Sequence, residues 1–341
     1  MKRLAHSISV LRILFAAATM ALAAKAGTTY VVYVGAETPD QGVQADAFFP
    51  NEVWLLQGDS ILYKFVPRNE IHTVTLLAPG QVRPPAPPPA GPPLGANCPA
   101  AAAPVTYNGS ACVSTQAGLT ALTTPSTFTV TFATPGNYKM VCLVHTDMNG
   151  TVHVLANNAA NAALLHPQSY YDQQGAQEAN AILNDNSSHQ PLPQPLSSQN
   201  LVVAGIGKIA GTGGGLQYGS VVRFLKDKIV IHKGESVTWE NLDPTEPHTV
   251  TFGAEPPMFI PPVPAGLSGQ AADGTLTATF NPAVFLNSGF LQAQAPDRTG
   301  TPQLSPGTTR ITITFNQPGT YSYHCALHDV DGMLGQVVVL P

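Results

Sequence analysis

Charged residues are scarce in this sequence, and basic residues are the scarcer kind. The 341 residues include 15 Lys and Arg against 20 Asp and Glu, which gives a formal net charge of −5 at pH 7. Proteins that bind nucleic acids usually carry a patch or run of basic residues, and this sequence has none. We therefore set aside a nucleic-acid-binding function. The 44% of hydrophobic residues are enough to build sizeable cores.

Long apolar runs are also missing after the N-terminus, so no further membrane span is expected. The first 26 residues combine a positive start, a short apolar core and a small-residue cleavage pattern, which predicts a signal peptide over residues 1–26. An uncleaved membrane anchor is the alternative. Cleavage would remove Lys2, Arg3, Arg12 and Lys25 but no acidic residue, which moves the net charge from −5 to −9. We expect a periplasmic or secreted protein.

Long helices are not expected either, because the chain has 32 prolines and 30 glycines. The chain instead contains an internal repeat. From Asn51, NEVWLLQGDSILYKFVPRNEIHTVTL aligns without a gap with DKIVIHKGESVTWENLDPTEPHTVTF from Asp227, and TFATPGNYKMVCLVH aligns with TFNQPGTYSYHCALH. Self-similarity of this extent indicates two copies of one domain. The expected division is a first domain over residues 27–156, a linker over 157–200 and a second domain over 201–341.

Each copy has the sequence pattern of a β-sandwich. KIVIHKGESVTWEN alternates apolar and polar residues on both sides of a Lys-Gly turn, which is typical of a β-hairpin. TRITITFNQPGTYSYHC repeats the pattern around a Pro-Gly turn. About seven or eight short strands per copy, without a helical period, favour sandwiches over an α/β fold. Part of the linker, QSYYDQQGAQEANAILND, is compatible with a short helix.

Cysteine is rare, and its four copies fall into two groups. In an oxidising compartment, an even number of cysteines favours disulfides. Cys98 and Cys112 lie in one loop, NCPAAAAPVTYNGSAC, and are the expected disulfide pair. Cys142 and Cys325 occupy matching positions in the two repeats, each in a Cys-x-x-His motif. We therefore expect Cys142 and Cys325 to have a role other than disulfide formation.

Each repeat supplies the donors that copper uses when it cycles between two oxidation states, namely a thiolate, two imidazoles and a weak axial thioether. The expected metal ligands are His72, Cys142, His145 and Met148 in the first domain and His248, Cys325, His328 and Met333 in the second. Three members of each set share one loop and the fourth comes from a distant strand, so folding must bring them together. A structural zinc site is the alternative, but zinc has little use for a thioether.

These motifs resemble those of the cupredoxins, the blue-copper family that includes plastocyanin, amicyanin and pseudoazurin. The Cys-x-x-His-x-x-x-x-Met spacing in the second repeat is similar to the plastocyanin loop, and the shorter spacing in the first is similar to the amicyanin loop. EIHTVTL and EPHTVTF resemble the strand of the family's first histidine. The resemblance implies an all-β fold of two tandem Greek-key β-sandwich domains, each with a type 1 copper site. Many family members have proline directly before the loop histidine, where this chain has Val144 and Leu327.

The resemblance also implies an electron-transfer protein that exchanges single electrons with a redox partner protein. In that arrangement His145 and His328 would lie near the surface. The apolar residues beside them would form a docking patch: Leu143, Val144, Ala326 and Leu327.

Nitrite reductases and multicopper oxidases, which are copper enzymes built from such domains, are an alternative. Their catalytic coppers need additional histidines, in His-x-His pairs or a few residues after the first ligand. HTVTLLA and PHTVTFG contain one histidine each, and only His324 is placed like a catalytic ligand of a further copper. We therefore expect no enzymatic activity. Copper storage or delivery is a third alternative, but six methionines are too few for a Met-rich carrier.

Overall fold

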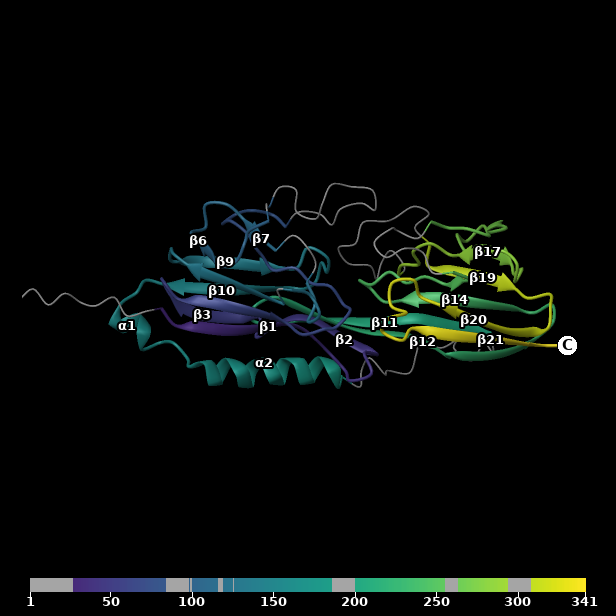
Figure 1. The fold of residues 1–341 in the computed structure, drawn as a ribbon, viewed down its shortest axis with the longest axis horizontal. Coiled ribbons are helices and arrows are strands. Elements are labelled where there is room, and N and C mark those ends of the chain that lie inside the picture. Colours follow the sequence, from purple (N-terminus) through teal and green to yellow (C-terminus); the bar gives the residue numbers. More distant parts are fainter. Residues whose placement is uncertain are drawn as a thin grey trace, which may run out of the picture.

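The computed structural model describes residues 27–83, 98, 100–115, 119–124, 126–185, 200–254, 263–293 and 308–341. The expected signal peptide over residues 1–26 lies outside these described residues. Figure 1 shows two blocks of strands that follow one another along the long axis, with the C-terminus at the outer end of the second block. Among the described residues, no helix is long and apolar enough to cross a membrane.

Short strands make up most of both blocks. The first block contains β1 (Thr29–Glu37), β2 (Val43–Phe49), β3 (Glu52–Leu56), β4 (Ser60–Phe65), β5 (Thr75–Leu76), β6 (Val105–Tyr107), β7 (Val113–Ser114), β8 (Thr127–Phe132), β9 (Gly136–Val141) and β10 (Asn149–Leu155). The second contains β11 (Leu201–Gly211), β12 (Leu216–Leu225), β13 (Lys228–His232), β14 (Ser236–Leu242), β15 (Thr251–Phe252), β16 (Gly269–Gln270), β17 (Leu276–Thr279), β18 (Leu286–Asn287), β19 (Arg310–Thr314), β20 (Gly319–His324) and β21 (Leu334–Leu340). Buried and half-buried side chains alternate along strands such as β4 and β8, because successive side chains point to opposite faces.

The described strands form three sheets. Two have five strands each, in the orders β3-β10-β9-β5-β7 and β13-β21-β20-β15-β18. The third has eleven strands, in the order β16-β17-β19-β14-β11-β12-β2-β1-β4-β8-β6. Each five-stranded sheet packs against its own end of the eleven-stranded sheet, which gives two sandwiches. The predicted all-β fold of two tandem β-sandwiches is confirmed.

The two sandwiches are joined because β2 and β12 pair edge to edge. These strands run antiparallel, with Val43 opposite Val221 and Asp46 opposite Tyr218. Each is the second strand of a hairpin, β1–β2 in the first sandwich and β11–β12 in the second. The repeats therefore meet along equivalent strands, which relates them locally by an approximate twofold axis.

Each sandwich has a hydrophobic core of its own. In the first, the rings of Phe48 and Tyr63 pack edge to face. In the second, Trp239 packs edge to face against both Phe252 and Tyr323. Such ring pairs add to the stabilisation that burial alone supplies. Two separate cores are in keeping with two domains, whose expected boundaries stay a prediction.

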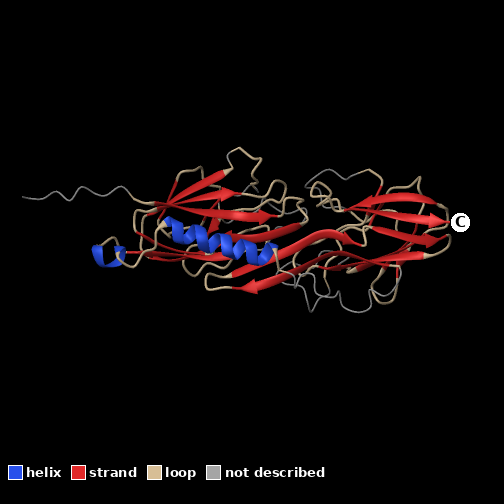
Figure 2. Cartoon of the chain, turned by 90° about the horizontal axis from the view of Figure 1, so that it is seen from below, coloured by secondary structure: helices blue, strands red, loops and turns tan. Residues whose placement is uncertain are grey.

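The predicted linker, residues 157–200, contains packed structure. Helix α1 (Ala159–Ala162) is short, whereas α2 (Gln168–Leu183) has 16 residues and runs along the strands of the first sandwich (Figure 2). The Tyr171 hydroxyl donates to the Trp54 carbonyl and accepts from the Trp54 N–H, both at 3.0 Å. Later turns of α2 pack on alanine and phenylalanine side chains of β2. The helix that the sequence allowed is therefore part of the first sandwich.

Gly175 lies where α2 crosses the chain at the end of β2. A Cβ at this position would lie 2.9 Å from the carbonyl carbon of Phe49 and 3.1 Å from the nitrogen of Pro50. Gly175→Val is therefore expected to push the helix away and to lower the free energy of unfolding by about 1–3 kcal/mol, although valine forms helices better than glycine. Urea unfolding measures the loss, with Ala176→Val at the exposed neighbouring position as control. Equal losses in both variants would contradict the contact.

Candidate metal centres

Strand ends bring the first set of predicted ligands together. β9 ends at Val141, and the loop from Cys142 to Met148 returns the chain to β10. The Cys142 N–H donates to the Met148 carbonyl at 3.0 Å, and the Met148 N–H donates to the His145 carbonyl at 3.3 Å. These two bonds close the loop. His72 reaches it from the segment before β5, because β5 pairs with β9.

Three of the four predicted ligands in the first sandwich converge. The Nδ1 atoms of His72 and His145 are 3.0 Å apart, and the Cys142 sulfur is 3.7 Å from His145 Nδ1. All three side chains are buried, and one ligand atom from each lies within 4.8 Å of the others. Met148 is fully buried on the same loop, and its role as axial ligand stays a prediction.

The second sandwich repeats this arrangement. His248 Nδ1 and His328 Nδ1 are 3.1 Å apart, and the Cys325 sulfur lies 3.9 and 3.5 Å from them. The Cys325 N–H donates to the Met333 carbonyl at 3.1 Å, and Met333 is fully buried. The second loop is longer than the first. The extra residues follow His328, so the Cys-x-x-His spacing is the same in both loops, and the distances among these ligands agree.

The two donor sets fit copper. Two imidazole nitrogens and a thiolate, buried among apolar side chains and accompanied by methionine, are the donors of blue-copper sites. Metal binding at a cysteine requires the deprotonated thiol. The groups around each sulfur determine how readily its thiol loses the proton. The chemistry of the donors supports copper binding.

Backbone N–H groups point at both sulfurs. Cys142 accepts from Thr73 at 3.3 Å and from His145 at 3.4 Å, and Cys325 accepts from Thr249 at 3.3 Å. Burial alone would raise the pKa of each thiol, but the hydrogen bonds and positive charge of the neighbouring histidines outweigh burial and lower the pKa well below its ordinary value. Both sulfurs are therefore set up to act as thiolates.

A glycine in a bulge makes room for the strand histidine of each site. Gly35 in β1 and Gly205 in β11 have φ values of +70° and +80°, and the register of each hairpin shifts there. A Cβ would overlap with the ring of His72 at Gly35 and with that of His248 at Gly205. Only glycine combines this backbone conformation with so close an approach. The sequence repeat contains this signal, since both copies place a glycine in the first strand.

The outer nitrogens of the strand histidines lie beside buried carboxylates. His72 Nε2 is 3.6 Å from Asp46, and His248 Nε2 is 4.0 Å from Asp243. Burial raises the pKa of Asp46 to about 6. Asp243 also accepts a hydrogen bond from the Tyr218 hydroxyl at 2.8 Å, which fixes its carboxylate. Both distances are longer than a hydrogen bond, so these carboxylates lie near the imidazoles without a direct hydrogen bond to them.

The loop histidines of the two sandwiches face one shared pair of glutamates. His145 Nε2 lies 3.1 Å from Glu70 and 3.4 Å from Glu246, and His328 Nε2 lies 3.8 and 3.9 Å from the same two residues. Glu70 belongs to the first sandwich and Glu246 to the second. Burial raises the pKa of Glu246. At Glu70 burial acts in the same direction, but the contact with His145 outweighs it and lowers the pKa to about 2.

The prediction that His145 and His328 lie near the surface is wrong. Each is 3% exposed, because both ligand loops lie at the inner ends of the two blocks, where the sandwiches meet (Figure 1). Leu143, expected in the docking patch, is buried in a small apolar cluster. No role is predicted for the two glutamates from the sequence. The signal was nevertheless there, because EIHTVT and EPHTVT each place a glutamate two residues before the strand histidine.

His324 belongs to neither donor set. It ends β20, where its backbone lies opposite Thr251 of β15. Within the described part of the chain, three groups of side chains could hold a metal, and His324 is in none of them. The third group, beside the two predicted sites, consists of Asp46, His145 and Glu246. The structure therefore gives no support to a further copper at His324.

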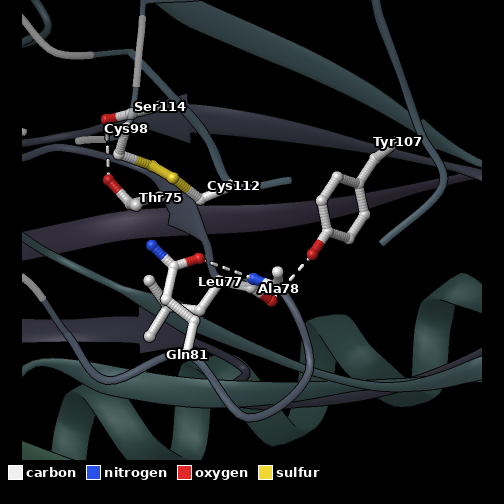
Figure 3. Close-up of a disulfide and its surroundings, with 8 residues drawn as sticks. All are labelled: Thr75, Leu77, Ala78, Gln81, Cys98, Tyr107, Cys112 and Ser114. Atoms are coloured by element: carbon white, nitrogen blue, oxygen red, sulfur yellow. Dashed lines mark hydrogen bonds between the residues drawn. A yellow bond between two sulfur atoms is a disulfide. The ribbon is translucent and has the colours of Figure 1, made fainter. Parts of the chain in front are cut away.

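The predicted disulfide between Cys98 and Cys112 is present, with Cα atoms 5.3 Å apart (Figure 3). It lies beside β5 and β7, whose Thr75 and Ser114 hydroxyls are hydrogen-bonded at 2.7 Å. β5 is also the strand that follows His72. The disulfide thus fastens Cys98 to the residue directly before β7, in the sheet that positions a predicted ligand.

Replacing Cys98 and Cys112 with alanine is expected to destabilise the first sandwich by about 3 kcal/mol, the loop-closure effect of a cross-link over some 15 residues. Urea unfolding with and without reductant measures it. Reductant should weaken the intact protein and leave the double variant unchanged. Because neither cysteine is a predicted ligand, copper content should stay the same. An unfolding free energy equal to that of the intact protein would contradict the stabilising role.

A family model described as copper binding proteins of the plastocyanin/azurin family matches residues 214–340. No curated protein matches the chain. Similar solved structures include a mutant plastocyanin of fern, with 16% identity over 41% of this chain and 98% of that one at a TM-score of 0.20. A purple cupredoxin from Nitrosopumilus maritimus has 20% identity over 41% of this chain and 97% of its own, with a TM-score of 0.20. A copper nitrite reductase from Nitrosomonas europaea has 10% identity over 92% of this chain and 94% of its own, with a TM-score of 0.22. The family match contains the whole donor set of the second sandwich, and it shows that residues 214–340 are similar to the copper-binding proteins of the plastocyanin/azurin family, the cupredoxins.

Proposed function

We propose that this protein is an exported electron-transfer protein with two type 1 copper sites, one in each sandwich. The observation that carries the proposal is the repetition of one buried donor set, in which two imidazole nitrogens 3.0 or 3.1 Å apart converge with a cysteine sulfur. Copper held there supplies a one-electron couple between Cu(I) and Cu(II). A redox partner protein that gives or takes the electron is part of the proposal.

The surroundings of each donor set favour electron transfer because they hold the ligands in one geometry. Backbone N–H groups fix both sulfurs, and the bulge glycines seat the strand histidines. Carboxylates lie beside the outer nitrogens of all four imidazoles. Ligands that are locked by packing and hydrogen bonds rearrange little when the charge of the site changes. A site of this kind suits repeated gain and loss of one electron.

A copper enzyme is the alternative, and the third group of possible ligands favours it. Asp46, His145 and Glu246 offer ligand atoms within 4.8 Å of one another where the sandwiches meet. However, His145 Nδ1 already faces the sulfur of Cys142 at 3.7 Å. The same imidazole would then have to bind two metals at once, which makes the electron carrier the better supported function.

Reductive titration of the copper-loaded protein distinguishes the carrier from the enzyme. A carrier takes up one electron at each of two sites, and its thiolate-to-copper absorption band bleaches and returns on reoxidation. It consumes neither nitrite nor oxygen catalytically. The double variant Cys142→Ser/Cys325→Ser, which lacks both thiolates, is the control for nonspecific copper. Steady consumption of nitrite or oxygen by the intact protein, absent in the control, would contradict the proposal.

A further inference from the structure

The two donor sets meet at one pair of carboxylates. Glu70 has one oxygen 3.1 Å from His145 Nε2 and its other oxygen 3.8 Å from His328 Nε2. Glu246 spans the same two nitrogens, at 3.4 and 3.9 Å. In the described ranges of the chain, the ion-pair contacts of these glutamates are with the two histidines and with no lysine or arginine. The contacts of these carboxylates are therefore directed to the two loop histidines.

The orientation of the imidazoles indicates how Glu70 and Glu246 act on the metal sites. Nδ1 of His145 and of His328 faces the cysteine sulfur of its own site, at 3.7 and 3.5 Å. A histidine that binds metal through Nδ1 carries its ring proton on Nε2, and here that nitrogen lies 3.1 to 3.9 Å from the oxygens of the glutamates. A carboxylate that accepts from the outer nitrogen orients the ring and makes the metal-binding nitrogen more basic. Each glutamate thus supports one ligand in its own sandwich and one in the other.

Further contacts across the junction hold the two ligand loops in place. Asn69, next to Glu70, donates to the Val330 carbonyl at 3.3 Å and to the Asp331 carboxylate at 3.2 Å, both in the second ligand loop. Arg223 of β12 donates to the Asp331 carbonyl at 2.7 Å and to a backbone carbonyl of the first sandwich at 2.5 Å. Together with the pairing of β2 and β12, these bonds keep both loops against the shared glutamates.

We propose that Glu70 and Glu246 are positioning residues that couple the two metal sites, so that the metal affinity of each site depends on a glutamate from the other sandwich. The coupling rests on the proposed function, which supplies copper as the metal. For a one-electron carrier, the consequence is that the two sites do not have independent reduction potentials. A change of charge at one loop histidine reaches the other through the carboxylates that both contact. Such coupling between sites is reciprocal.

Single-site variants test the coupling directly. Cys142→Ser leaves the site of the second sandwich, and Glu70→Gln is then introduced in the first sandwich. We expect the second site to bind Cu(II) about tenfold more weakly, which is the lower end of the effect of removing such a carboxylate. A chelator competition measures this loss. With Cu(I) affinity unchanged, the reduction potential rises by about 59 mV. The reciprocal variant, Cys325→Ser with Glu246→Gln, should weaken the first site in the same way.

Two further substitutions serve as controls. Glu235→Gln, at an exposed turn between β13 and β14, should leave both sites unchanged. Glu70→Asp keeps the charge and should retain more affinity than Glu70→Gln, and it replaces that variant if the glutamine prevents folding. Unchanged affinity of the second site in the Cys142→Ser/Glu70→Gln protein would overturn the coupling. So would a Cu(II) ion bound by the Cys142→Ser/Cys325→Ser protein and lost with Glu70→Gln, because the glutamates would then be ligands of a metal of their own.

Titration with Co(II) separates a failure of the coupling from a failure of the proposed function. If copper binds without a thiolate-to-copper band, the electron-transfer proposal fails. The Co(II) affinities of the same single-site variants still decide whether a glutamate of one sandwich supports the site of the other. The coupling is supported if a glutamine substitution in one sandwich lowers the Co(II) affinity of the site in the other sandwich. It is overturned if that affinity does not fall.

Discussion

Replacing Cys325 with serine is expected to leave the chain with one copper instead of two. The Cys325 sulfur is the anionic donor of the second set, and the histidines around it lower the pKa of its thiol. A serine hydroxyl keeps its proton at neutral pH and cannot take this role. We expect the copper content per chain to halve and the thiolate-to-copper absorption to fall with it. Elemental analysis and the visible spectrum measure both quantities.

Cys142→Ser is the matched variant for the first sandwich. It should also leave one copper, with the absorption of the second site. The double variant should have no thiolate-to-copper band at all. Loss of both coppers in either single variant would contradict the assignment of one complete donor set to each sandwich, and so would the loss of neither.

Gly205→Ala should damage the second site almost as severely, although it changes no ligand. The residue has a φ of +80°, and an added Cβ would overlap with the ring of His248. The backbone strain alone costs about 1–3 kcal/mol for a residue other than glycine. The overlap must also displace His248 from its position 3.1 Å from His328 Nδ1. We therefore expect the second sandwich to lose its copper while the first keeps its own.

Gly211→Ala is the control for this substitution. Gly211 ends the same strand, β11, and nothing lies within 4 Å of a Cβ added there. It should keep the copper content and lose little stability in urea unfolding. Equal copper contents in the Gly205→Ala and Gly211→Ala proteins would show that the bulge glycine does not position the histidine.

The donor sets could be predicted from the sequence because most of each set is local. Cys325, His328 and Met333 lie on one loop between paired strands, and the strand histidine recurs at the same offset in both repeats. Alternation of apolar and polar residues likewise predicted the strands that hold them. The disulfide between Cys98 and Cys112 could be predicted because both cysteines lie in one loop and outside the repeated motifs.

The way in which the two sandwiches meet could not be predicted. It depends on the edge-to-edge pairing of β2 with β12, and edge pairing leaves no sequence motif. Without knowledge of that pairing, a glutamate two residues before His72 or His248 cannot be told apart from any other polar residue near a ligand. With it, the two glutamates become a shared contact of both loop histidines, which buries side chains that family resemblance places at the surface.

From the sequence, helix α2 could be anticipated only as a segment whose composition is compatible with a helix, and its position could not be predicted. Its position comes from polar anchors rather than from a wide apolar stripe. Gln168 pairs with the backbone of Val31 through hydrogen bonds of 2.8 and 3.2 Å, and Glu178 accepts from the Asn51 N–H at 3.2 Å. Because these partners are more than a hundred residues away in the sequence, no local pattern indicates them.

Copper per chain, measured with the visible and EPR spectra of the purified protein after removal of residues 1–26, tests the central claim most directly. The two donor sets predict two coppers, an intense thiolate-to-copper band and EPR signals with narrow hyperfine splitting only. A colourless protein that holds zinc would contradict copper at these sites. A further copper with a weakly coloured, wide-hyperfine signal would contradict an electron carrier and indicate an enzyme.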